Sequence, residues 1–261
     1  MTAKLHVRPL PRTWRTYARY DRATATGLER RHLKPAPLTP ISLGYSCEVK
    51  YQIIRRLNAL RYAGDADTLA HALQREHRPS PADRHIFDWQ ITPFAAVCAY
   101  LQSDFEQVFE RADLMVADDG SEAIHRSLHT RHPHEFPAGE GGLTEAMIDD
   151  YYPAARSKFD YLAQRFRDHL SRPGQFLYIF KEMRSDSEVQ TLIGLLSSRS
   201  PDHEVRLLLV DYEGADPSLG GLSDQVSQGW IPRCSDKPPD RAWEGDDNAW
   251  DRIFKNFDLA I

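Results

Sequence analysis

The feature that most constrains the fold of this chain is a strand–helix–strand pattern between residues 176 and 210. Residues 176–180 (FLYIF) and 205–210 (VRLLLV) have the aromatic and branched composition of buried strands. The segment 186–199 between them reads as a helix that ends before Pro201. Because two strands joined by a crossover helix lie parallel, the pattern predicts an α/β fold.

Other segments extend this prediction. A short buried strand is expected at 41–43, and helices are expected at about 46–60, 66–77, 144–170 and 247–257, with one more from Pro93 to Phe109. Residues 112–143 show no clear periodicity. We therefore predict a helix-rich single domain around a small, mostly parallel sheet.

The first 39 residues differ from the rest in charge. They contain nine lysines and arginines against Asp21 and Glu29. We interpret residues 1–39 as a basic N-terminal arm and residues 40–261 as the α/β domain. The arm is either solvated or docks on an acidic partner or a membrane surface.

Composition excludes several classes of protein. The net charge of −5, without a basic face in the domain, argues against a nucleic-acid binder. No apolar run reaches the roughly 18 residues of a transmembrane segment. The cysteines Cys47, Cys98 and Cys234 show no CxxC spacing, which favours a reducing compartment and a soluble, cytoplasmic protein. No glycine-rich phosphate-binding motif is present, so no cofactor is expected.

Cys47 is the most reactive position that the sequence predicts. It follows the strand at 41–43 and a turn at Gly44, and it falls in the first turn of the helix at 46–60. The amides and dipole of a helix N-terminus stabilise a thiolate and can hold an oxyanion. The alternative is a small buried side chain that packs the junction between strand and helix.

A cysteine nucleophile needs a base, which is usually histidine. Four candidates lie within ten positions, namely His125, His129, His132 and His134. His125 and His129 are spaced as on one face of a helix, whereas His134 precedes an aromatic anchor at Phe136.

A third residue commonly orients the histidine. Asp88 lies between two aromatic residues, where a buried carboxylate needs a hydrogen-bonding partner. Asp211 closes the strand at 205–210, at the edge of a parallel sheet where functional groups gather. Asp211 is equally suited to cap a turn, and the choice between the two stays open.

Three motifs together resemble a known family. Residues 42–47 (SLGYSC), 87–89 (FDW) and 134–136 (HEF) resemble a bacterial family of unknown function that is classed with the papain-like cysteine peptidases. The resemblance covers about residues 40–212. It implies Cys47 as the nucleophile, His134 as the base and Asp88 as a candidate third member. This chain departs from the family pattern at Ile86, where the family has proline, and at Glu135, where it has aspartate.

We therefore predict a cysteine-dependent hydrolase or acyl transferase that acts on an amide or (thio)ester of a peptide or small acyl substrate. Thiolate Cys47 would attack the carbonyl, and protonated His134 would release the leaving group.

Two other functions are considered. The segment from His125 to His134 could bind a metal through His132-x-His134, with Asp118 or Asp119 adding a carboxylate. A non-catalytic accessory protein of a polysaccharide pathway could instead line a sugar-binding cleft with tryptophans, and the candidates are Trp89, Trp230, Trp243 and Trp250.

Overall fold

The computed structural model describes residues 37–63, 84–106, 108–215, 223–233 and 237–260. These residues belong to one compact unit that begins at Ala36. Most of the predicted basic arm and all of the helix expected at 66–77 lie outside the described residues, so both stay predictions.

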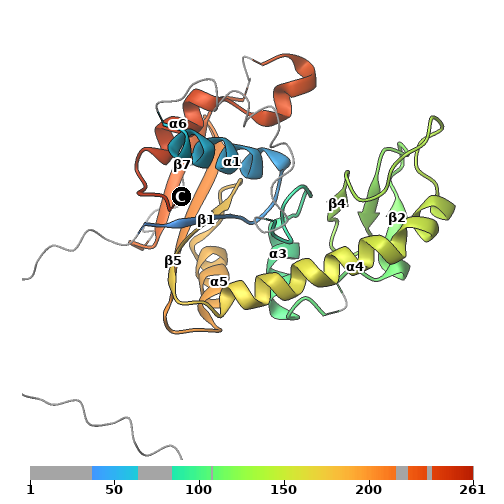
Figure 1. Cartoon of the computed structure of the whole chain (residues 1–261), viewed down its shortest axis with the longest axis horizontal. Helices are drawn as coiled ribbons and strands as arrows, with labels where there is room; N and C mark the ends of the chain where they lie inside the picture. The colour runs from blue at the N-terminus through green and yellow to red at the C-terminus, as the bar shows by residue number, and fades with distance from the viewer. Residues whose placement is uncertain (1–36, 64–83, 107, 216–222, 234–236, 261) are drawn as a thin grey trace, which may run out of the picture. The chain divides into compact units, whose positions relative to one another are not determined.

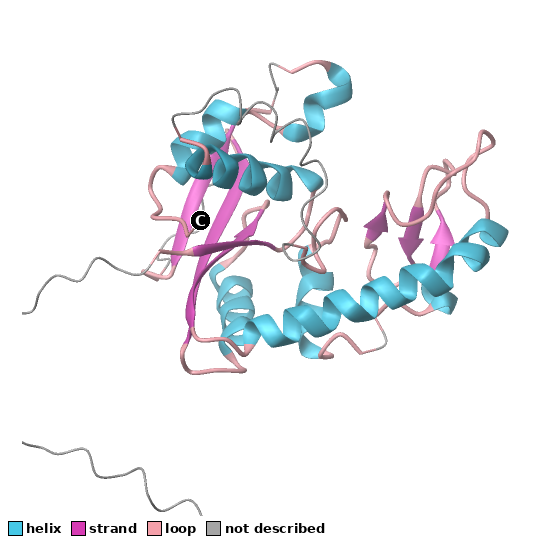
Figure 2. Ribbon diagram, in the orientation of Figure 1, coloured by secondary structure: helices cyan, strands magenta, loops and turns pink. Residues whose placement is uncertain are grey.

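A four-stranded parallel sheet forms the centre of this unit. Its strands are β1 (Thr39–Ser42), β5 (Gly174–Phe180), β6 (His203–Tyr212) and β7 (Val226–Ile231), in the order β1-β5-β6-β7. Every neighbouring pair is parallel. The predicted α/β fold with a mostly parallel sheet is confirmed (Figure 2). Strand β7 was not predicted, because its sequence VSQGWI lacks the apolar run of a central strand.

Helices α1 (Cys47–Arg61) and α6 (Asp247–Phe254) cover one face of the sheet (Figure 1). They bury apolar side chains against alternate residues of the strands, such as Leu177 and Ile179 of β5. Alternate residues of a strand point to opposite faces, so the remaining residues of β5 face the other layer. That alternation places a hydrophobic core on each side of the sheet.

The other face packs on helices α3 (Phe94–Gln102), α4 (Glu145–Leu170) and α5 (Asp186–Ser197). Their core includes Tyr178 and Phe180 of β5, both fully buried. The predicted helices at 144–170 and 186–199 are confirmed to within two residues at each end. Helix α3 is shorter than predicted.

Helix α3 ends at Gln102, although its apolar spacing continued to Phe109 in the sequence. Asp104 and Phe105 have positive φ angles of 54° and 59°, which stop the helix. Phe105 and Phe109 nevertheless stay in the core. The helical period therefore predicted their burial and not their secondary structure.

A second, antiparallel sheet occupies the segment without clear periodicity. It consists of β2 (Leu114–Val116), β3 (Ala123–His125) and β4 (Arg131–His132). Strands of two or three residues are too short to show an alternating pattern. His125 ends β3 and His129 follows in a turn with φ 54°, so these two histidines do not share a helix face.

Among the residues that the structure describes, no helix is both long enough and apolar enough to cross a membrane.

Candidate active site

The structure brings Cys47 into contact with one of the four candidate histidines. Cys47 is the first residue of α1, and His134 lies in the loop after β4. The Cys47 Sγ and His134 Nε2 atoms are 3.5 Å apart, although 87 positions separate the residues in the chain. The Cys47 thiol is partly exposed. Of the four candidates, this contact selects the histidine that the resemblance implied.

The turn before α1 determines where Cys47 lies. Gly44 has a φ of 86°, and a Cβ atom at this position would lie 2.9 Å from the Thr92 Oγ1 atom. Tyr45 also has a positive φ, of 70°. Both the conformation and the close approach therefore require glycine at position 44. The turn delivers Cys47 to the carboxyl edge of the parallel sheet, where functional groups of α/β proteins gather.

The first turn of α1 is fixed by buried contacts of Glu48. Its carboxylate accepts a hydrogen bond of 2.8 Å from the Trp250 indole of α6 and forms an ion pair with Lys181, which follows β5. Lys181 also donates to the Tyr212 hydroxyl at 2.8 Å. Glu48 and Lys181 are both buried. Because the residue next to Cys47 is held by both the sheet and α6, Cys47 has little freedom to move.

In the described part of the chain, no side chain caps the N-terminus of α1. Ser46 is the N-cap residue, and its side chain makes no capping hydrogen bond. The first N–H groups of a helix have no acceptor within the helix. They lie beside the Cys47 thiol and can stabilise negative charge that develops there.

A row of aromatic side chains begins at the imidazole of His134. The Trp89 ring meets it edge-on, with 6.1 Å between the ring centroids. Trp89 in turn contacts Trp243, which is 43% exposed, and Trp243 contacts Tyr51 of α1. These residues form an aromatic wall that we call the Trp89–Trp243 wall.

The four tryptophans considered for a sugar-binding cleft do not lie together. Trp250 belongs to α6 and is fully buried in the core, and Trp230 belongs to β7. Only Trp89 and Trp243 are in contact with each other.

Asp88 takes a different place from the one that the resemblance implied. One of its oxygens is 2.9 Å from the Lys50 ammonium of α1 and accepts a hydrogen bond of 2.7 Å from the His85 amide. In the part of the chain that the structure describes, Asp88 makes no hydrogen bond to His134. The side chains of Asp88 and Lys50 are 2% and 6% exposed. Asp88 thus ties the turn that carries Trp89 to the helix that carries Cys47.

Asp211, the other candidate, caps a turn. Its two oxygens accept hydrogen bonds from the backbone amides of Met183 and Tyr212. Sequence reasoning did not find Lys50 or Glu48. The helical period gave no signal for either, since Glu48 and Lys50 lie to the two sides of Val49 and outside the apolar stripe of the helix.

The electrostatic environment favours a neutral thiol. Burial is the main cause that raises the pKa of the Cys47 thiol to about 11; the Cys47 amide opposes it, and the negative charges of Asp88 and Glu122 add to it. Glu122 is itself buried and pairs with Arg131 of β4. The sequence led us to expect a thiolate, and the burial of the thiol corrects that expectation for the resting protein.

The histidine segment does not assemble a metal site. His132 is buried with its ring 5.1 Å from that of Phe109, and burial lowers its pKa to about 3. His134 instead faces Cys47. Within the described ranges, no group of three histidine, cysteine or carboxylate side chains is arranged to hold a metal ion.

Comparisons with known proteins yield no match to a family model, to a curated protein or to a solved structure. The assignment of the site therefore depends on its geometry, and the resemblance of the three motifs stays a prediction.

We predict that Asp88→Asn destabilises the protein by about 3 kcal/mol, because it removes the carboxylate charge that lies 2.9 Å from the buried Lys50 ammonium. Chemical denaturation measures this loss. The same variant should lower the apparent pKa of Cys47, since it removes one of the negative charges that raise it.

Asp149→Asn is the matched control. Asp149 pairs with Arg111 and is 63% exposed, so its loss should cost less than about 1 kcal/mol. Equal losses for the two variants would show that the Lys50–Asp88 pair does not hold the site.

We predict that alkylation of Cys47 accelerates with pH beyond the range of an ordinary thiol. A raised pKa means that the thiolate fraction keeps growing towards pH 11, with no plateau near 9. Iodoacetamide rates, measured on a Cys98→Ser/Cys234→Ser background, report this dependence. Glu122→Gln should shift the profile to lower pH. A plateau below pH 9 would contradict the assignment of a neutral resting thiol.

Proposed function

We propose that the protein is a cysteine-dependent hydrolase or acyl transferase in which Cys47 is the nucleophile and His134 is the general base. The observation that carries this proposal is the 3.5 Å contact between the two side chains at the N-terminus of α1. The contact joins residues that are 87 positions apart in the chain. A thiol that only packs the junction between strand and helix would not need a histidine beside it. The resemblance of residues 42–47, 87–89 and 134–136 to papain-like cysteine peptidases points the same way.

The proposed reaction begins from a neutral Cys47 thiol. The Cys47 Sγ atom attacks the carbonyl carbon of an amide or (thio)ester, and its proton passes to His134 Nε2 as the S–C bond forms. The carbonyl oxygen becomes an oxyanion beside the free amides of the first turn of α1. His134 then gives the proton to the leaving amine, alcohol or thiol as its bond to the carbonyl carbon breaks.

The second half of the reaction regenerates the thiol. Water or another nucleophile attacks the thioester on Cys47, and His134 accepts the proton from the attacking atom. The acyl group leaves as a carboxylic acid or a transferred acyl product. The S–C bond breaks, and the sulfur recovers a proton from His134.

The surroundings of the pair are suited to a peptide or small acyl substrate. The Trp89–Trp243 wall offers apolar area next to His134, and Trp243 is exposed enough to contact a ligand directly. A free thiol nucleophile requires a reducing compartment, and we place the reaction in the cytoplasm for that reason.

The proposal is tested by trapping the acyl-enzyme. We expect p-nitrophenyl acetate to acylate Cys47 and to release p-nitrophenolate. Tandem mass spectrometry locates the acetyl group, and absorbance measures its rate of transfer. Cys47→Ala should abolish the adduct, and His134→Asn should slow acylation about 100-fold, since proton transfer to a positioned base contributes roughly that factor.

His129→Asn is the matched control. His129 lies five residues before His134 and is exposed, without a contact to Cys47. In the His129→Asn variant, Cys47 should be acylated at the wild-type rate. The proposal would be overturned if His134→Asn left the rate of acylation unchanged, or if the acetyl group were found on Cys98 instead of Cys47.

A further inference from the structure

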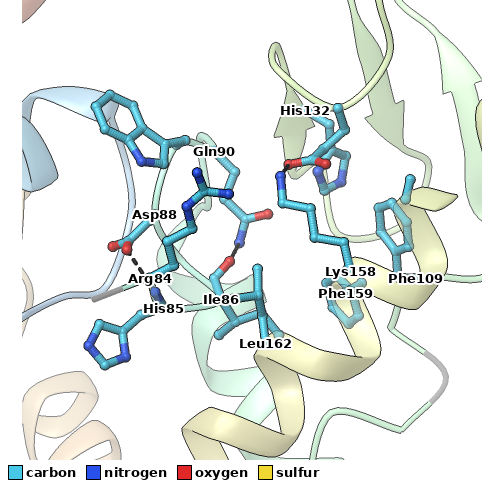
Figure 3. A pocket seen from close by; sticks show the side chains of 13 residues that line it. Arg84, His85, Ile86, Asp88, Gln90, Phe109, His132, Lys158, Phe159 and Leu162 are labelled. Carbon is cyan, nitrogen blue, oxygen red and sulfur yellow. Dashed lines mark hydrogen bonds and ion pairs between the residues drawn. The ribbon is translucent and has the colours of Figure 1, made fainter. Parts of the chain in front are cut away.

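A cavity lies beside the candidate active site, on the other side of Trp89. Its walls are the turn at 84–90, the residues His132 and Glu135 around the end of β4, and the middle of α4. Its volume is about 460 Å³, counting the open space at its mouth. Neither Cys47 nor His134 lines it. Figure 3 shows the side chains that reach into this space.

Several polar atoms of the lining have no partner. The atoms Arg84 Nε, His85 Nδ1, Asp88 Oδ1 and His132 Nε2 are buried, and none has a hydrogen-bond partner in the described part of the chain. His132 is 1% exposed and Asp88 is 8% exposed. Buried polar atoms are nearly always satisfied in folded proteins. The four residues that carry these atoms make one side of the cavity polar.

Among the charged side chains of the lining, one cation has no ionic partner in the described part of the chain. Lys158 pairs with Glu135 at 2.6 Å, and Asp88 pairs with Lys50. Burial lowers the pKa values of His85 and His132, so both imidazoles are neutral at pH 7. Arg84 makes no ion pair with any described residue, and its guanidinium lies beside Gln90 in Figure 3. Arg84 is thus the one charged side chain of the lining that has no ionic partner among the described residues.

The wall formed with α4 is apolar. It consists of Phe109, Ala155, Phe159 and Leu162. A guanidinium at one side and aromatic and aliphatic side chains at the other match a ligand with an acidic head and an apolar body.

We propose that this cavity binds a small organic carboxylate whose acidic group pairs with Arg84 and whose apolar body packs against Phe109, Phe159 and Leu162. Arginine suits this role because its planar guanidinium can form two hydrogen bonds with one carboxylate. Trp89 is shared between the cavity and the candidate active site. The binding does not depend on the chemistry of Cys47.

Isothermal titration calorimetry with benzoate tests the proposal. Benzamide has nearly the same shape without the charge, and benzylamine has the opposite charge. We expect benzoate to bind about tenfold more tightly than benzamide, which is the gain typical of a charge-assisted pair, and we expect benzylamine not to bind. The proposal would be overturned if benzoate and benzamide bound with equal affinity, or if benzoate did not bind at millimolar concentration.

Variants locate the binding. Arg84→Gln should raise the Kd for benzoate about tenfold. Arg252→Gln, on the exposed side of α6, should leave that Kd unchanged. Ala155→Leu fills the apolar side and should abolish binding while the protein still unfolds cooperatively. Protein alkylated at Cys47 should still bind benzoate. If only alkylation removes the binding, the ligand occupies the candidate active site and the proposed cavity site is wrong.

Discussion

The buried ion pair between Lys50 and Asp88 holds the candidate site together. It joins α1, which carries Cys47, to the turn that carries Trp89. Trp89 then contacts the His134 ring. A buried charge that loses its partner is expensive, so this connection is strong only while both members are present. The position of His134 relative to Cys47 therefore depends on a pair that touches neither of them.

The same region contains conformations that a free chain would avoid. Tyr45 and Trp89 both have positive φ angles, of 70° and 62°, and they flank the Cys47–His134 pair in the fold. Such conformations cost free energy and persist only where the surrounding contacts impose them. Anchored residues lie close to both in the chain: Glu48 contacts Lys181 and Trp250, and Asp88, next to Trp89, pairs with Lys50. This placement of strain is typical of functional sites.

Much of the fold was predictable because long elements carry their period in the sequence. The parallel sheet followed from residues 176–210, and α4 matches the helix expected at 144–170. The small antiparallel sheet was not predictable, since its strands have only two or three residues. In the site, Cys47 and His134 could be named. The role of Asp88 could not, because a sequence shows that a buried carboxylate needs a partner and does not show which partner the fold supplies.

The central claim is that the Cys47 thiol and the His134 imidazole form a pair. Nitrogen NMR of the histidine rings tests it without a substrate. Cys47→Ala should change the ring-nitrogen chemical shifts of His134, which lies 3.5 Å from the thiol, and it should leave those of His129 unchanged. If the His134 shifts were the same in the wild type and in Cys47→Ala, the two side chains would not interact, and Cys47 would be a structural thiol.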